Sequence, residues 1–266
     1  MQEPTSGAVS TRLEIRLRAD RAPRNAFGVG ATLLGVLAGE LVSAVLLGIA
    51  YAIAGNGHTP STFVRDVAGL VGLWIGFVGT VIWASMAHAA NVALKVRLRD
   101  EFGFSIRWSD VPLGIALGLF GQYVLVLLLE LPLYPFVPHL FHRLGAPART
   151  LTSGESGTTL AVVGVLVCIG SPIVEELFFR GLLFRGLIGV ARDRLGWRAV
   201  PAVLSSAALS GLIFGFVHFE ALQLLALSGF GMALALVAVW TGRLGAGIVA
   251  HVTFNAVTFI ALALQK

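Results

Sequence analysis

Two adjacent glutamates interrupt an otherwise apolar stretch of the chain. The segment SPIVEELFFRGLLF, residues 171–184, carries Glu175 and Glu176, and Arg180 follows one helical turn later. Ionisable side chains are costly in apolar segments of membrane length, so each is a candidate for function. Glu176 and Arg180 are four residues apart and share one helix face, where they can form an ion pair. Glu175 is rotated by about 100° and has no cation nearby in the sequence, which leaves its carboxylate available as a general base.

Two later apolar segments carry polar side chains at the same spacing. The stretch GLIFGFVHFE places His218 four residues after Phe214, and HVTFNAV places His251 four residues before Asn255. A single His or Asn in a membrane helix more often joins neighbouring helices than catalyses a reaction. A single buried Glu–Arg pair can likewise be a structural brace. Polar groups in three apolar segments together predict one polar site that the fold assembles.

These three groups resemble the motifs EExxxR, FxxxH and HxxxN of the CPBP family. The matching stretches are EELFFR, FGFVH and HVTFN, and Pro172 agrees with the proline that precedes the glutamates in the family. The family takes in type II CAAX prenyl endopeptidases and bacteriocin-processing or immunity proteins. The resemblance covers about residues 160–260 and implies intramembrane proteolysis. The N-terminal helices carry no signature of a family.

The resemblance also implies a role for each motif residue. Glu175 would activate a water molecule, with help from His218, for attack on a peptide bond. His251 and Asn255 would stabilise the oxyanion of the tetrahedral intermediate. The Glu–Arg pair would orient the site. These roles agree with the chemistry, because water must lose a proton to a group within about 3 Å and an oxyanion needs fixed hydrogen-bond donors.

The same side chains fit a second mechanism. Glu175, His218 and His251 form a ligand set for catalytic zinc, with water in the fourth position. The chain has no HExxH motif, which argues mildly against a standard zincin. We therefore favour a glutamate-dependent mechanism without a cofactor, and zinc remains the alternative.

Two hypotheses without proteolysis stay open. The first is a membrane immunity or scaffold protein of the same family that retains the pocket. The second, which we favour less, is a proton-coupled transporter, because acidic and His residues also build proton relays. A transporter is expected to have two matched halves, whereas the polar residues here cluster in one half of the chain.

The composition places the site in a lipid environment. Of the 266 residues, 56% are hydrophobic and 12% are charged, which is about half the charged fraction of soluble domains. We therefore predict an all-α, polytopic bundle of about seven membrane helices, within a range of six to eight, around an intramembrane polar cavity. Apolar windows of spanning length lie at 27–54, 67–92, 111–132, 159–184, 200–218, 222–240 and 244–264.

The charged residues organise the chain into three parts. A basic tail is predicted over 1–26, N-terminal membrane helices and loops over 27–158, and catalytic helices over 159–266, all in one membrane domain. Lys and Arg cluster in the tail and around 95–107 and 185–198, so the N-terminus is expected in the cytoplasm of a multi-pass cell-membrane protein. The expected partners are the bilayer and a membrane-anchored or lipidated peptide substrate. No nucleic acid is expected.

Overall fold

The described part of the chain is a bundle of membrane-length helices. A computed structural model describes residues 26–265 except 56, 89–92, 153 and 155–156. These residues form no β-strand, and seven helical stretches among them are long and apolar enough to cross a membrane. The spans are Gly28–Ala54, Thr62–Ala87, Asp110–Leu133, Gly157–Asp193, Ala199–Phe216, Leu224–Thr241 and Gly245–Ala263. The predicted all-α membrane bundle is therefore confirmed, whereas the tail predicted over 1–26 lies, apart from Ala26, outside the described residues.

The elements follow one another in this order. The first half contains α2 (Ala26–Ala54), α3 (Thr62–His88), α4 (Leu94–Asp100), α5 (Asp110–Phe120), η1 (Gly121–Leu125), α6 (Val126–Glu130), η2 (Leu131–Leu133), α7 (Leu140–Leu144) and α8 (Ala146–Thr152). The fourth span is one continuous rod of α9 (Gly157–Val165), η3 (Leu166–Gly170), α10 (Ser171–Glu175), η4 (Glu176–Phe184), α11 (Arg185–Gly189) and η5 (Val190–Arg194). The chain ends with α12 (Ala199–Phe216), α13 (Leu224–Thr241) and α14 (Gly245–Ala263).

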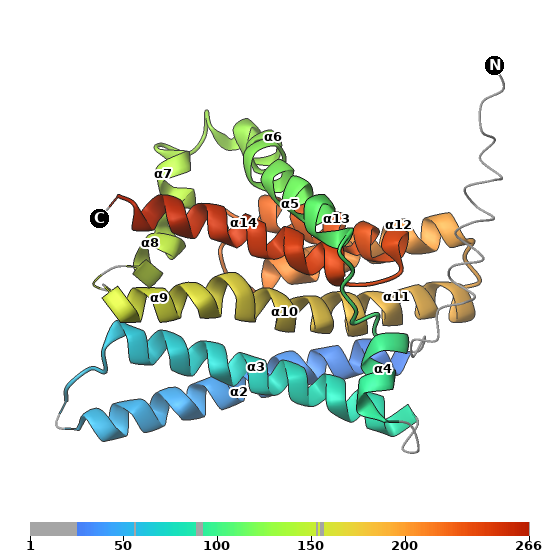
Figure 1. The fold of residues 1–266 in the computed structure, drawn as a ribbon, viewed down its shortest axis with the longest axis horizontal. Coiled ribbons are helices and arrows are strands. Elements are labelled where there is room, and N and C mark those ends of the chain that lie inside the picture. The colour runs from blue at the N-terminus through green and yellow to red at the C-terminus, as the bar shows by residue number, and fades with distance from the viewer. Residues whose placement is uncertain (1–25, 56, 89–92, 153, 155–156, 266) are drawn as a thin grey trace.

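The fourth span lies in the middle of the bundle. Figure 1 shows the α2–α3 pair along one side of it, and α5, α6 and α12 to α14 along the other. Contacts join its α10 and η4 segments to α3 on one side and to α14, α12 or α13 on the other. Every residue of η4 is buried. The segment with the paired glutamates is therefore shielded from lipid by neighbouring helices on both sides.

Glycines allow the helices of the N-terminal pair to approach closely. A Cβ atom on Gly72 would lie 2.4 Å from Ser43 Cα, and one on Gly76 would lie 2.3 Å from Gly39 N. Small residues four apart are a common packing device of membrane helices, because van der Waals contact there replaces the hydrophobic effect. Similar glycine pairs occur where α5 meets α14 and where α12 meets α13.

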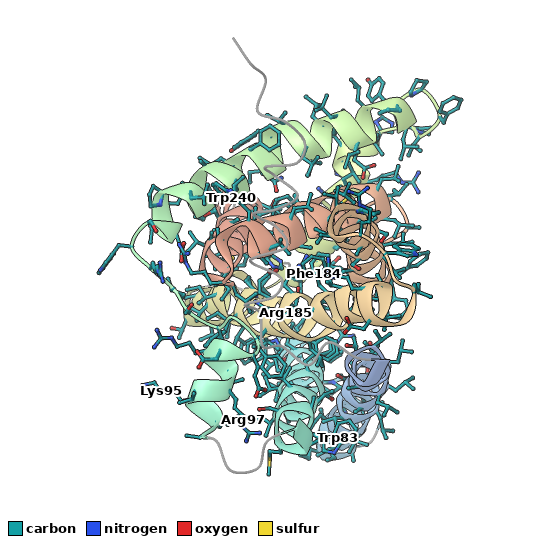
Figure 2. The ribbon with its side chains drawn as sticks, turned by 90° about the vertical axis from the view of Figure 1, so that its right-hand side faces the viewer. Trp83, Lys95, Arg97, Phe184, Arg185 and Trp240 are labelled. Carbon is teal, nitrogen blue, oxygen red and sulfur yellow. The ribbon has the colours of Figure 1, made fainter. Side chains whose placement is uncertain are left out.

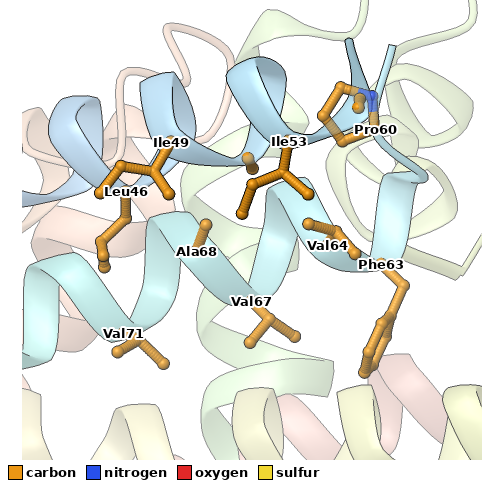
Figure 3. A pocket seen from close by; sticks show the side chains of 11 residues that line it. Leu46, Ile49, Ile53, Pro60, Phe63, Val64, Val67, Ala68 and Val71 are labelled. Carbon is orange, nitrogen blue, oxygen red and sulfur yellow. The ribbon is translucent and has the colours of Figure 1, made fainter. Parts of the chain in front are cut away.

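The outer surface of the bundle is apolar. In α2 the exposed fractions are 67% for Leu37, 66% for Leu41 and 81% for Ile53. Figure 3 shows a groove between α2 and α3 that only apolar or small side chains line, Ile49, Val64 and Val67 among them. Contiguous exposed apolar surface of this kind is unfavourable in water and is expected in lipid.

Two predicted helix ends differ from the structure. The second apolar window is predicted to begin at 67, but α3 begins at Thr62. The hydroxyl of Ser61 accepts a hydrogen bond from Val64 N, so this serine caps the helix in spite of the polar residues that follow. The fourth span also continues to Asp193, beyond the predicted end at 184, because Arg185 is buried within the bundle and does not mark its surface.

The basic clusters of the described residues lie at one end of the bundle. Leu244 N donates a hydrogen bond to Gly103 O, and a Cβ on Gly103 would touch the guanidinium of Arg185. Figure 2 looks onto this end and labels Lys95, Arg97 and Arg185 there. By the positive-inside rule this end faces the cytoplasm, which remains a prediction.

Candidate active site

The fourth span is irregular just before the paired glutamates. Ser171 N donates to Leu166 O across the π-helical turn η3. The next residue, Pro172, has no N–H group and so leaves the Val167 carbonyl without its donor in this pattern. The side chain of Asn255, from α14, donates its Nδ2–H to Val167 O at 3.0 Å. The HxxxN motif therefore fastens α14 to the point where proline interrupts the helix.

Glu176 and Arg180 form the ion pair that their spacing predicted. Oε1 of Glu176 lies 2.8 Å from Nη1 of Arg180, and both side chains are completely buried. The guanidinium also donates from Nη2 to Gly231 O at 3.2 Å and lies 4.3 Å from the centre of the Phe214 ring. A Cβ on Gly247 would lie 3.1 Å from Oε2 of Glu176. Glycine at 247 thus leaves room for the carboxylate.

His251 lies between the two glutamates. Its Nδ1 is 3.1 Å from Oε1 of Glu176, and because an ionised carboxylate only accepts hydrogen bonds, Nδ1 is the donor. Its Nε2 lies 3.8 Å from Oε2 of Glu175. The Glu176–Arg180 pair therefore fixes the ring orientation and proton position of His251, and turns the other nitrogen toward Glu175.

Glu175 is the more accessible of the two acids. Its side chain is 18% exposed, against 0% for Glu176. Its Oε2 accepts no hydrogen bond from the described residues. The predicted asymmetry is thus present in the geometry: the Glu176 carboxylate is fully buried against a cation, whereas the Glu175 side chain is partly exposed.

His218 lies in the turn after α12, beside the same aromatic ring. Its Nδ1 donates to Phe214 O at 2.7 Å, which leaves Nε2 as the acceptor of the neutral ring. The Phe214 ring packs edge-on against both imidazoles, with centroid distances of 4.7 Å to His218 and 5.6 Å to His251. FxxxH and HxxxN therefore meet at one phenylalanine.

The zinc ligand set does not gather closely. Among the described residues, no three His, Cys, Asp or Glu side chains lie close enough together to hold a metal ion. Glu175 and His251 are neighbours, whereas His218 is turned toward its own helix by the Phe214 carbonyl. In this arrangement Glu175, His218 and His251 do not fit a zinc centre.

Two further buried acids act as structural braces. Glu130 is completely buried at the end of α6 and accepts a hydrogen bond from Ala226 N, in the first turn of α13. Asp110 accepts from both Arg243 Nε and Arg107 N, and so joins the start of α5 to the α13–α14 turn. Spacing along the chain does not reveal the pairs with Ala226 and Arg243, because these partners lie 96 and 133 residues away.

Comparisons with known proteins agree with the motif resemblance. Residues 157–257 match the family described as "Type II CAAX prenyl endopeptidase Rce1-like". A protein of Bacillus subtilis (strain 168), named "Putative membrane peptidase YdiL", is 24% identical over 198 residues, which cover 72% of this chain and 71% of that protein. No solved structure gives a significant match. The predicted resemblance is confirmed: the segment that carries the three motifs matches the Rce1-like family, and a protein named as a putative membrane peptidase is a distant relative of the chain.

Proposed function

We propose that this protein is an intramembrane endopeptidase that hydrolyses a peptide bond of a membrane-associated substrate. The observation that carries the proposal is the pairing of Glu175 with His251, whose Oε2 and Nε2 atoms lie 3.8 Å apart inside a membrane span. A partly exposed acid beside a histidine that a second acid fixes is an arrangement suited to activating water. The family match supports proteolysis as the reaction.

Glu175 is proposed as the general base. Its carboxylate would accept a proton from water as the water oxygen attacks the substrate carbonyl carbon. His218 would assist from the Phe214 side, where its Nε2 can accept a hydrogen bond. The same Glu175 would then return the proton to the amide nitrogen that leaves, so that the carboxylate is restored when the peptide bond breaks.

His251 and Asn255 are proposed to stabilise the oxyanion. As an imidazolium, His251 would donate from Nε2 while its Nδ1–H stays on Glu176. Asn255 uses one amide hydrogen on Val167 O and keeps a second for a ligand. Fixed donors in a site with little water stabilise developing charge more strongly than donors in bulk solvent.

Glu175, His218, His251 and Asn255 would carry out the proposed reaction without a metal ion. His251 lies beside both glutamates at this site, and His218, the third residue of the zinc alternative, donates to a backbone carbonyl. The substrate is proposed to be lipidated or membrane-anchored, because the site lies within the bundle. The location is proposed to be the cell membrane, with the basic end in the cytoplasm.

Replacing Glu175 by Gln tests the proposal. The purified full chain in lipid nanodiscs would be assayed with a quenched fluorescent peptide ending in a farnesylated CAAX sequence, and with the same peptide on a non-prenyl membrane anchor. Loss of the general base should lower kcat by about 10²–10⁴-fold. Glu40→Gln is the matched control, because Glu40 is an exposed glutamate on α2.

Two outcomes separate the hypotheses. If Glu175→Gln retains the cleavage rate of the control variant, the proposed mechanism is wrong. The scaffold hypothesis gains support if the wild-type protein cleaves neither peptide and cells that express Glu175→Gln show the same phenotype as cells that express the wild-type protein. Zinc content and the effect of a chelator on the same sample decide whether a metal takes part.

A further inference from the structure

The first membrane span carries an acidic side chain on its surface, near its middle. Glu40 is exposed and belongs to the span Gly28–Ala54. At about 1.5 Å per residue it lies roughly 18 Å from one end of the span and 21 Å from the other. No hydrogen bond or ion pair joins its carboxylate to the rest of the described residues. An ionisable group at this depth is costly in lipid and is expected to have a polar partner.

Small side chains follow Glu40 along the surface of α2. Ala44 and Gly48 come at intervals of four residues, and both are exposed. A Cβ on Gly48 would meet nothing within 4 Å. We call Glu40, Ala44 and Gly48 the α2 outer stripe. Small residues four apart let a second membrane helix approach closely, so a helix that lies along this stripe can bring its backbone near Glu40.

The packing of α2 within the chain leaves this stripe uncovered. The neighbours of α2 are α3, η4 and α11, and Figure 1 shows the α2–α3 pair at the lower edge of the bundle. Gly39 faces α3, where a Cβ would lie 3.3 Å from Leu73 Cα. Glu40 is the next residue and is turned about 100° away from that contact. The partner of its carboxyl group must therefore come from outside the described part of the chain.

We propose that the α2 outer stripe binds a second copy of this chain. Two copies inserted with the same orientation place Glu40 at the same depth, and a two-fold axis along the membrane normal brings equivalent residues together. Two carboxyl groups that share one proton form a hydrogen bond, because the protonated group donates and the other accepts. A different protein would have to supply a donor or a cation at this depth, whereas a second copy supplies its own.

The contact is separate from the candidate active site. The site residues described above come from the fourth span, α12 and α14, so each copy keeps its own set. The inference does not depend on the proposed endopeptidase function. Cleavage by one copy in a nanodisc does not need the contact. Glu40→Gln also keeps a side chain that donates and accepts hydrogen bonds, so it remains a suitable control for the cleavage assay.

The test is energy transfer between copies in liposomes. Full-length chains that carry a donor or an acceptor fluorescent protein at the C-terminus are mixed and diluted with increasing amounts of lipid. Glu40→Leu should weaken dimerisation about 3- to 30-fold, which is the effect of one hydrogen bond between membrane helices. Glu40→Gln should dimerise about as well as the wild-type protein. Energy transfer that falls to the level of random proximity at every dilution of the wild-type protein would overturn the proposal.

Two glycines provide a matched pair of packing variants. Gly48→Leu should weaken dimerisation, because its side chain would occupy the space of the approaching helix. Gly79→Leu should not, because Gly79 lies on α3 outside the stripe. Both glycines are exposed, and a Cβ on either meets nothing within 4 Å, so both variants should fold. Equal dimerisation of the wild-type, Glu40→Leu and Gly48→Leu proteins would overturn the proposal.

Cross-linking in native membranes gives a second measurement. Ala44→Cys and Gly79→Cys are made in a Cys168→Ser background and oxidised with copper phenanthroline. A disulfide needs Cα atoms within about 7 Å of each other, so Ala44→Cys should yield a dimer of this chain and Gly79→Cys should not. If Ala44→Cys instead links only to another protein, and the purified wild-type chain is monomeric in liposomes, the proposal of a second copy is wrong.

Discussion

Removing the guanidinium of Arg180 should be among the most destabilising single changes in the fourth span. The guanidinium lies 2.8 Å from the carboxylate of Glu176 with both side chains fully buried. With an effective dielectric constant of about 20, the attraction between unit charges at that distance is about 6 kcal/mol. Desolvation of both ions offsets much of this attraction. Breaking the pair from one side leaves a buried charge and should cost about 3–5 kcal/mol.

A double-mutant cycle isolates the pair from its surroundings. Arg180→Met and Glu176→Gln should each lower the free energy of unfolding by about 3–5 kcal/mol, whereas the double variant should cost no more than either single change. Arg180→Lys should be only a partial replacement. A compact ammonium cannot reach both Glu176 and Gly231 O, the two groups that the guanidinium contacts now.

The assay is reversible unfolding in mixed micelles, followed by tryptophan fluorescence. Arg65→Met is the matched control, because Arg65 is exposed near the start of α3 and its guanidinium donates a hydrogen bond to Thr62 in the same helix. Its change in unfolding free energy should stay within about 0.5 kcal/mol. If Arg180→Met proves as stable as this control, or if the two single changes simply add, the buried ion pair does not hold the fourth span.

Two further changes test the packing of the bundle. Gly76→Val should prevent the close approach of α2 and α3, because even a Cβ at this position would lie 2.3 Å from Gly39 N. Gly79→Val on the same helix is the control, because a Cβ there meets nothing within 4 Å and the variant should fold normally. Size-exclusion chromatography in detergent distinguishes the two variants, and a monodisperse Gly76→Val sample would contradict the packing. Arg243→Met should leave the buried carboxylate of Asp110 with only its backbone donor and lower the melting temperature by the equivalent of about 1.5–3 kcal/mol. Asp110→Asn in the same background should recover part of that loss. Equal melting temperatures for Arg243→Met and the wild-type protein would show that the Asp110–Arg243 pair does not brace the fold.

The amino-acid sequence determined the class of fold and the chemical groups of the site. Long apolar windows predicted the seven spans, because a bilayer sets their length. Helical periodicity also paired Glu176 with Arg180, since residues four apart are neighbours on any helix. Local sequence placed two helix ends wrongly, at Ser61 and Arg185, where a cap or a buried charge shifted the end of the helix.

Only the tertiary structure decided which polar groups meet. His251 is 75 residues from Glu176, and Asn255 is 88 residues from the carbonyl that it binds, so no periodicity relates them. Their contacts depend on α14 packing along the fourth span, where Gly247 leaves space for a carboxylate and Pro172 removes a backbone donor. Helix periodicity acts over a few residues, whereas the site depends on how whole helices pack against one another.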